Sequence, residues 1–283
     1  MKKVLCYIVL IITTVFCLCG CTDKNNQQST FSIQFIDVGQ GDSALIECDG
    51  QFMLIDGGDV SAGDKVYSVL EEKGIQHLDI LVMSHLHADH IGGLTKALTY
   101  ASDIDLTISN SDYVDKETFR KVEHELGING SKITVPSVGQ EYQLGSATVE
   151  VIDVSSKEDN DSLVLLITYG KTRFLFTGDI EETAQTRIAD KFENEDDKAY
   201  DIDLIKMPHH GSYTGTLYRF VRTFMPEYAI ISAGKDNTYG HPNEKTLDLL
   251  NGKSWSAKVY RTDENGDIIV KSDGKTLSIT TSK

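Results

Sequence analysis

From residue 31 onward, two patterns of hydrophobic and polar positions alternate along the chain. Short runs of apolar and β-branched residues are typical of strands, and apolar residues spaced three and four apart are typical of amphipathic helices. The runs predict strands at residues 31–38, 43–48, 51–58, 78–84 and 105–110, and the helical spacing predicts helices at residues 64–74, 92–101, 115–127, 181–192 and 242–250. The Asp49-Gly50 pair between the second and third runs predicts a hairpin turn. The alternation predicts an α/β fold.

The pattern of residues 42–90 recurs in residues 161–212. Each copy opens with Asp-Ser, contains a hairpin pattern that ends with adjacent Asp and Gly, and continues into a helix and then into an apolar strand that runs into histidines. The same order of features in both copies favours an internal repeat over chance. We therefore expect two similar β-rich layers packed face to face, with helices outside and the histidine loops at one edge.

The N-terminal segment has the pattern of an export signal. Residues 1–20 combine a short basic start, an apolar run and small residues, which predicts a secretory signal peptide. The tetrad Leu18-Cys19-Gly20-Cys21 resembles a bacterial lipobox, which would make Cys21 the lipid-bearing first residue; the alternative is an uncleaved anchor helix. Residues 21–30 are polar and predict a flexible tether, so residues 31–283 are expected to form the folded domain.

Charge and cysteine content narrow the function classes. The chain has 27 basic and 43 acidic residues, a formal net charge of −16, which argues against tight, passive binding to nucleic acid. It does not exclude a polyanionic substrate held by metal ions in a local pocket. Of the five cysteines only Cys48 lies within the expected domain, which excludes a disulfide scaffold.

The densest group of ligand-type side chains is His85, His87, Asp89 and His90, directly after an apolar strand. Neutral imidazole and carboxylate are the ligands of divalent transition metals, typically zinc. Alternate residues of an extended segment point the same way, so His85 and His87 can hold one ion, and Asp89 and His90, beyond the bend, can hold a second. The alternative, a solvated polar loop, fits four such residues in six positions poorly.

The spacing is that of the His-x-His-x-Asp-His motif, and it resembles the metallo-β-lactamase superfamily. The segments "FIDVGQGDSALIE", "LIDGG", "SHLHADHIGG", "NDSLVLLI", "FLFTGD", "IKMPHHGS" and "ISAGKDNTYGHP" are similar, in the same order, to the metallo-β-lactamase-like domain of the ComEC competence proteins and their free-standing relatives. The resemblance extends less fully to the pneumococcal teichoic acid phosphorylcholine esterase. It implies a four-layer αββα sandwich, in agreement with the repeat.

The resemblance also implies roles for residues outside the motif. Asp179 would bridge the two metals, and His209 would complete the second metal site, with His210 beside it as a further ligand or a catalytic substrate contact; the choice between these two histidines stays open. Asp56 would orient a ligand histidine from behind. His241 would bind substrate or act as a general acid, the alternative being a loop residue that caps a helix.

One departure from the superfamily pattern concerns the first metal. Most members carry a further histidine between the motif and the bridging aspartate, where this chain has Asn160 and Asp161. Oxygen ligands and substrate are then expected to complete that site, with Asn160 as a substrate contact, and the metal is zinc or, if oxygen ligands prevail, manganese. Ser212 is expected to contact substrate rather than to act as a nucleophile, because the chain has no G-x-S-x-G motif.

These features predict a metal-dependent hydrolase with two divalent ions and with Asp89, His210 and His241 as its catalytic residues. The resemblance implies a phosphodiesterase acting on nucleic acid or nucleotides outside the membrane, and the lipobox implies a lipoprotein on the extracellular face of the cell membrane. The alternatives are a cell-wall phosphodiesterase, a carboxylic ester or lactone hydrolase, and a non-catalytic surface binding module. The expected partners are the phosphodiester substrate and the membrane, and no obligate protein partner is evident.

Overall fold

The computed structural model describes residues 30–155, 157, 160–193, 201–253 and 255–283. The predicted signal peptide, Cys21 and all of the predicted tether except Thr30 lie outside these residues. Among the helices in the described part, none has the length and apolar character needed to cross a membrane.

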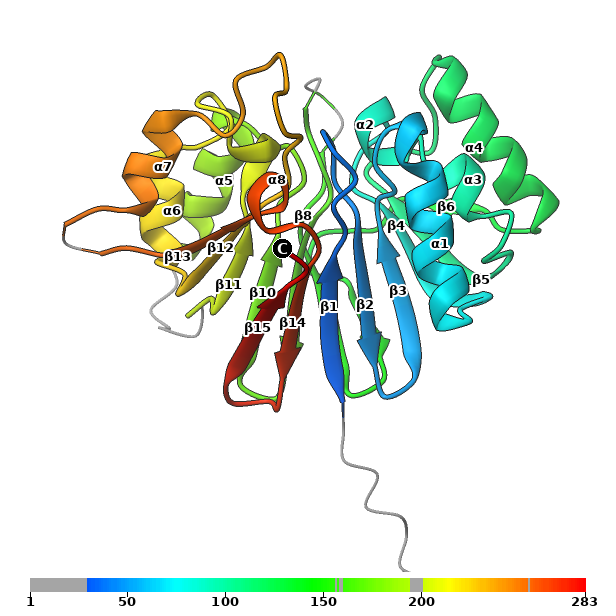
Figure 1. The fold of residues 1–283 in the computed structure, drawn as a ribbon, viewed down its shortest axis with the longest axis horizontal. Helices are drawn as coiled ribbons and strands as arrows, with labels where there is room; N and C mark the ends of the chain where they lie inside the picture. The colour runs from blue at the N-terminus through cyan, green and yellow to red at the C-terminus, as the bar shows by residue number, and fades with distance from the viewer. Residues whose placement is uncertain (1–29, 156, 158–159, 194–200, 254) are drawn as a thin grey trace, which may run out of the picture.

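Two mixed sheets form the centre of the molecule (Figure 1). The first sheet has the strand order β15 (Leu277–Thr281), β14 (Ile268–Ser272), β1 (Phe31–Phe35), β2 (Ala44–Cys48), β3 (Gln51–Ile55), β4 (His77–Met83), β5 (Asp103–Ser109) and β6 (Ile133–Thr134). The second has the order β13 (Lys258–Arg261), β12 (Tyr228–Ile231), β11 (Leu204–Lys206), β10 (Thr172–Phe176), β9 (Val164–Tyr169), β8 (Ala147–Asp153) and β7 (Glu141–Leu144).

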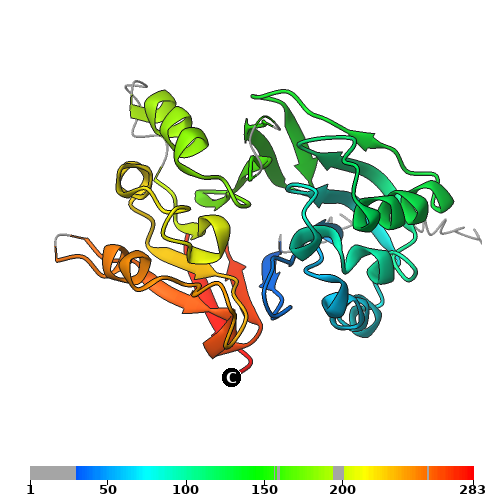
Figure 2. The same cartoon turned by 90° about the horizontal axis from the view of Figure 1, so that it is seen from above.

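In the described part of the chain, seven helices lie on the outer faces of the two sheets (Figures 1 and 2). Those of the first half are α1 (Gly63–Lys73), α2 (Ala88–Ile91), α3 (Leu94–Ala97) and α4 (Glu117–Ile128), and those of the second half are α5 (Glu182–Glu193), α6 (Tyr218–Phe224) and α7 (Glu244–Leu250). The short α8 (Thr262–Asn265) lies near the middle of Figure 1, where the chain passes from the second sheet to the first. Single-turn 3₁₀ helices occur at η1 (Val60–Ala62) and η2 (Pro208–Gly211).

Three separate apolar layers hold the sandwich together. The middle layer lies between the sheets and includes the stacked rings of Phe31 and Phe174, with centroids 4.9 Å apart. One outer layer packs α1 to α4 against the first sheet and includes Leu70 and Leu54, and the other packs α5 to α7 against the second sheet. This arrangement confirms the predicted four-layer αββα sandwich.

The predicted internal repeat appears as repeated topology. Strands β2 and β3 are antiparallel and β4 is parallel to β3, and strands β9, β10 and β11 repeat this pattern in the second sheet. The predicted hairpin turn at Asp49-Gly50 is present, with positive φ at both residues. The two halves therefore bring equivalent strand ends to the same edge.

The helix predicted at residues 92–101 is wrong in its extent. Within this range the structure has the short α3 (Leu94–Ala97), and α2 ends at Ile91, just before Gly92 and Gly93. A Cβ at Gly93 would lie 2.1 Å from the carbonyl oxygen of Gly57. The chain therefore crosses another loop at this point, and this close approach interrupts the regular helix.

Candidate metal centre

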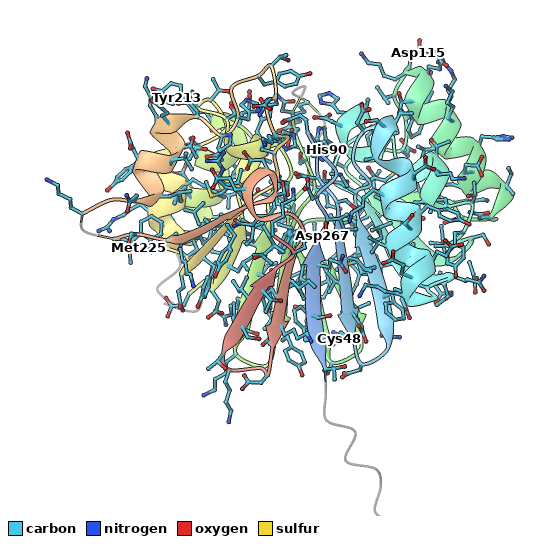
Figure 3. The ribbon with its side chains drawn as sticks, viewed as in Figure 1. Cys48, His90, Asp115, Tyr213, Met225 and Asp267 are labelled. Atoms are coloured by element: carbon cyan, nitrogen blue, oxygen red, sulfur yellow. The ribbon has the colours of Figure 1, made fainter. Side chains whose placement is uncertain are left out.

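Three strand ends deliver the polar residues of the site to the upper edge of the sandwich (Figure 3). Strand β4 leads into residues 85–90, β10 leads to Asp179, and β11 leads into η2 (Pro208–Gly211). The backbone N–H of Leu163 donates to the carbonyl of Ser84 at 2.7 Å and so ties the loops of the two sheets together.

The three histidines of the motif gather in one cluster. The ring centroid of His85 is 4.6 Å from that of His87 and 4.1 Å from that of His90. His85 and His90 are buried, whereas His87 is partly exposed. The motif therefore brings its histidines together, as expected of a metal centre.

Asp179 lies at the middle of this group. Its Oδ2 is 3.2 Å from Nε2 of His90 and 3.3 Å from Nε2 of His210, and its backbone N–H donates to the hydroxyl of Ser162 at 3.0 Å. Burial alone would raise the pKa of Asp179, but the charges of His210 and His90 hold that pKa well below its usual range. An ionised carboxylate in this position is suited to bind two cations.

The structure distinguishes the two adjacent histidines of η2. Nε2 of His210 lies 3.3 Å from Oδ2 of Asp89, whereas His209 turns aside, with its Nδ1 3.1 Å from Oε1 of Glu181 and its Nε2 3.9 Å from Asp179. Both histidines have positive φ, which separates their side-chain directions. The geometry therefore favours His210 over His209 as the ligand beside Asp89, and it leaves His209 at the cavity wall.

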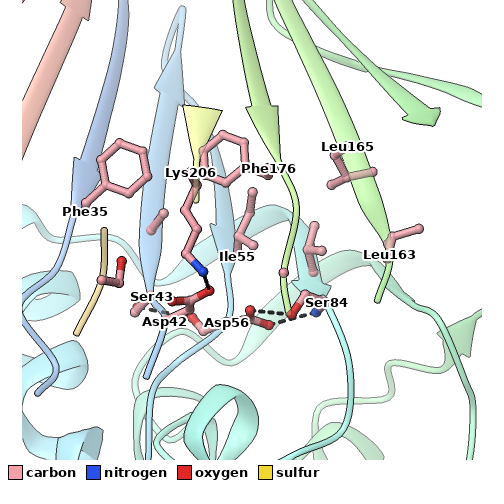
Figure 4. A pocket seen from close by; sticks show the side chains of 14 residues that line it. Phe35, Asp42, Ser43, Ile55, Asp56, Ser84, Leu163, Leu165, Phe176 and Lys206 are labelled. Atoms are coloured by element: carbon pink, nitrogen blue, oxygen red, sulfur yellow. Dashed lines mark hydrogen bonds and ion pairs between the residues drawn. The ribbon is translucent and has the colours of Figure 1, made fainter. Parts of the chain in front are cut away.

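Asp56 supports the site from behind, as the resemblance implies. Its carboxylate accepts from the Ser84 hydroxyl at 2.6 Å and from the Ser84 backbone N–H at 2.7 Å (Figure 4). It also accepts from Nδ1 of His90 at 2.8 Å. A proton held on Nδ1 leaves Nε2 of His90 free to bind a metal.

Unsatisfied buried atoms indicate that this cluster is built for metal ions. Within the described residues, Nε2 of His85 and Oδ1 of Asp179 are buried without a hydrogen-bond partner. Burial and the neighbouring His90 charge hold the pKa of His85 well below its usual range, so its imidazole is neutral. Unsatisfied nitrogen and carboxylate oxygen at one buried point are costly unless a cation binds them, so these residues fit divalent metal ions.

The sequence reasoning missed a buried ion pair beneath the cluster. Lys206, at the end of β11, contacts the Asp42 carboxylate (Figure 4). Asp42 Oδ1 also lies 3.2 Å from Nδ1 of His210. Nδ1 of His210 also lies 3.0 Å from the carbonyl oxygen of Ser232. Asp42 thus stands behind His210 as Asp56 stands behind His90, and the repeated Asp-Ser pairs at residues 42–43 and 161–162 were the signal for it.

A cavity of about 280 Å³ opens above the cluster. Its lining includes Asn160, His209, His241 and Tyr239, whose ring stacks on that of His241 with centroids 5.8 Å apart. Burial and the charges of His210 and His209 lower the pKa of His241 to about 4. The imidazole of His241 is therefore neutral near pH 7.

Two polar residues near the site are engaged within the protein. Ser212 is buried, and its hydroxyl accepts from the Gly215 N–H at 3.0 Å and pairs with the Thr214 hydroxyl at 2.9 Å. Its hydroxyl therefore shapes the loop after η2, and its role in substrate binding stays a prediction. The Asp161 carboxylate accepts from the Lys157 N–H at 3.1 Å, and Asp161 lines a cavity beside His85 and His87.

Comparison with protein families identifies a superfamily match over most of the chain. The model described as the metallo-beta-lactamase superfamily matches residues 36–235. ComE operon protein 3 of Bacillus subtilis (strain 168) is 32% identical over 259 residues, which cover 83% of this chain and 32% of that protein. The chain thus spans about a third of the length of this relative.

Solved structures share the fold at low sequence identity. The metallo-beta-lactamase fold protein YhfI from Bacillus subtilis is 14% identical with a TM-score of 0.56, and the match covers 86% of this chain and all (100%) of that one. A diphosphatase from the PhnP family is also 14% identical, with a TM-score of 0.51 over 81% of this chain and 94% of the other. At these identities the likeness extends to the fold alone.

Proposed function

The chain belongs to the metallo-beta-lactamase superfamily, and from this premise we propose that it is a metal-dependent hydrolase of phosphodiester bonds in nucleic acid or nucleotides, acting outside the membrane. The observation that carries the proposal is the cluster of His85, His90, His210 and Asp89 around the buried carboxylate of Asp179. The competence-protein relative supports the nucleic-acid substrate class.

Two divalent ions are the implied cofactors. His85 and His87 would hold one, Asp89, His90 and His210 would hold the other, and Asp179 would contact both. Such ions lower the pKa of a water nucleophile and neutralise charge on a phosphate. The imidazole ligands favour zinc, and the incomplete histidine set around the first ion leaves manganese as the second choice.

The remaining residues hold these ligands in position and face the substrate. Asp56 fixes the ring of His90, and the carbonyl of Ser232 fixes that of His210. The neutral His241 faces the cavity, where it can form a hydrogen bond to a phosphoryl or leaving-group oxygen without adding a charge of its own. His209, held by Glu181, supplies a second contact from the same wall.

The proposed location follows from the N-terminal pattern and not from the fold. Lipidation at Cys21 would anchor the protein to the extracellular face of the cell membrane. At that location the protein would meet DNA, nucleotides and wall polymers, which are the phosphodiester substrates considered above. Labelling with a radioactive fatty acid, lost in a Cys21→Ala variant, tests the anchor.

The direct test is hydrolysis of bis(p-nitrophenyl) phosphate and single-stranded DNA by the purified protein with added zinc or manganese. The matched control is Asp89→Ala/His90→Ala, which removes two ligand-type side chains. Metal-dependent cleavage that is absent from the control supports the proposal. If the metal-loaded protein cleaves p-nitrophenyl acetate or a lactone and neither phosphodiester, the carboxylic ester alternative replaces it.

Cleavage of p-nitrophenylphosphorylcholine in preference to DNA would favour the alternative that the substrate is a cell-wall phosphodiester. A protein that binds metal at this site and hydrolyses none of these substrates would be a binding module. A single set of assays therefore distinguishes the phosphodiesterase, ester hydrolase and binding-module alternatives.

A further inference from the structure

We infer that the cavity beside His85 and His87 binds a second phosphate group of the substrate through Lys116 and Lys157. The inference rests on the proposed phosphodiesterase function and specifies its substrate class further. The preferred substrate would carry a phosphate next to the bond that is cut, as an oligonucleotide or a terminally phosphorylated nucleotide does.

The cavity has a volume of about 350 Å³, and His85 and His87 form its boundary with the metal centre. Its other wall begins at Asn110, directly after β5. Strands β4 and β5 are parallel neighbours, so their carboxyl ends lie side by side. Crevices at such ends are the usual ligand sites of α/β sheets. A substrate at the metals can therefore extend into this cavity.

Lys116 is at a position that helix stability does not favour. It is the N-cap residue of α4, and its side chain makes no capping hydrogen bond. The N-terminus of a helix repels a cation and attracts an anion. Within the described residues, the Lys116 ammonium forms no ion pair. Its charge and the N-terminus of α4 both favour an anion in the cavity.

Lys157 lines the same cavity, and its backbone is held in place. Its backbone N–H donates to Oδ2 of Asp161 at 3.1 Å, and the Ser155 hydroxyl contacts the same carboxylate. The side-chain amide of Asn110 donates to the carbonyl oxygens of Ser155 at 2.8 Å and Asp161 at 2.6 Å. These hydrogen bonds connect Ser155, Lys157 and Asp161 to the end of β5.

The charges on the two sides of the metal centre differ. The chain as a whole has a net charge of −16, so an anion needs local cations to approach it. On the side of His209, a cavity of about 550 Å³ is lined by Glu181 and Glu182, which repel phosphate. Asp161 also lines the cavity of Lys116 and Lys157, but its Oδ2 already accepts from the Lys157 N–H at 3.1 Å and from the Ser155 hydroxyl. We therefore expect the second phosphate on one side of the scissile bond only.

The first measurement compares kcat/KM for three thymidine dinucleotides with the metal-loaded protein: TpT, pTpT and TpTp. They have the same diester, and the last two carry an extra phosphate at one or the other end. In the wild type we expect one of the two to exceed TpT by about tenfold, as for one charge-assisted contact. In Lys116→Gln/Lys157→Gln we expect that ratio to fall to nearly one.

The matched control is Lys171→Gln/Lys275→Gln, which removes the same number of charges. These lysines are exposed in the β9–β10 and β14–β15 turns, at the other end of the sandwich (Figure 1). The control is expected to keep the wild-type ratio. A ratio near one in the wild type, or an unchanged ratio in Lys116→Gln/Lys157→Gln, overturns the inference.

A binding measurement separates this inference from the proposed function. Calorimetry compares thymidine 3′,5′-bisphosphate with the two thymidine monophosphates, none of which contains a diester, on the zinc-loaded protein. Tighter binding of the bisphosphate that is lost in Lys116→Gln/Lys157→Gln supports the second phosphate site even if no diester is cleaved, in which case only the proposed function fails. Equal binding of all three in the wild type overturns the inference whether or not the protein is active.

Discussion

The support that Asp56 gives to His90 yields a prediction about metal affinity. Asp56→Asn has the same shape and removes the negative charge. Both carboxylate oxygens are engaged in the wild type, Oδ1 by the Ser84 N–H at 2.7 Å and Oδ2 by the Ser84 hydroxyl at 2.6 Å and His90 Nδ1 at 2.8 Å. An amide has only one oxygen, so its NH₂ group must face one of these donors.

Each orientation of the amide has a defined cost. If the NH₂ faces the backbone N–H of Ser84, a buried hydrogen bond is lost, at about 1–3 kcal/mol. If the NH₂ faces His90, then Nδ1 must accept, and the ring proton moves to Nε2, where it blocks metal binding. Loss of such outer partners typically weakens metal binding by about 10- to 100-fold. We expect a decrease in zinc affinity of that size.

The assay is competition for zinc against a chromophoric chelator, with thermal unfolding measured in parallel. The control is Asp203→Asn, because the Asp203 carboxylate accepts from the Arg173 N–H at 2.7 Å at the opposite end of β11. The control is expected to lose some stability and to keep wild-type zinc affinity. If Asp56→Asn binds zinc within about twofold of the wild type, the argument that this carboxylate sets the state of His90 is refuted.

Three further predictions concern the loops, the core and pH. In Gly41→Ala the new Cβ would lie 2.2 Å from the carbonyl oxygen of Asp89, so we expect loss of stability and of zinc affinity, measured by thermal unfolding and chelator competition. Phe174→Ala empties a fully buried position between the sheets and is expected to lower the free energy of unfolding in urea by about 3–5 kcal/mol. Slight burial lowers the pKa of His77, but the hydrogen bond to Asp103 outweighs it and raises this pKa above its usual value. The pair of protonated His77 with Asp103 therefore stabilises the fold fully below the unfolded-state pKa, and this stabilisation is lost as the pH rises through the folded-state pKa. His77→Gln should therefore differ from the wild type in urea unfolding at pH 5.5 and match it at pH 9.

Each of these three variants has a control or an outcome that would contradict its prediction. Gly39 also has a positive φ, but no atom lies within 4 Å of the Cβ that Gly39→Ala would add, so this variant should keep wild-type zinc affinity. Equal zinc affinity in both glycine variants would contradict the close-approach argument. A loss below about 1 kcal/mol for Phe174→Ala would mean that the sheets repack around the gap. A stability difference for His77→Gln that grows with pH would have the wrong sign.

Local patterns were sufficient to predict much of this fold. The apolar runs that became β2, β3, β4 and β5 and the spacing of α1, α4 and α5 are short-range signals, and the internal repeat indicated how the halves pack. The resemblance to the metallo-β-lactamase superfamily and its competence proteins is confirmed by the family match and the relatives. The motif histidines were predictable because their ligand chemistry and their place after a buried strand are both visible in the sequence.

The rest depended on long-range contacts and on backbone conformation. The difference between His209 and His210 arises from positive φ angles in η2, which a His-His pair does not reveal. Lys206 ends an apolar strand and looks like the first exposed residue after it, but Asp42, from the other sheet, buries it. The pairing of β1 with β14 has no local signal either.

The position of β1 in the middle of the first sheet links the metal centre to a strand pair far along the chain. β1 is hydrogen-bonded on one side to β2 and on the other to β14, with Phe31 opposite Ser272. Contacts of this sequence separation form slowly, so we expect the pairing with β14 to be a late step in folding. The segment after β1 carries Asp42, whose Oδ1 lies 3.2 Å from Nδ1 of His210. We therefore expect the β14–β15 hairpin to influence how fast the support of His210 forms during folding, although it contributes none of the proposed ligands.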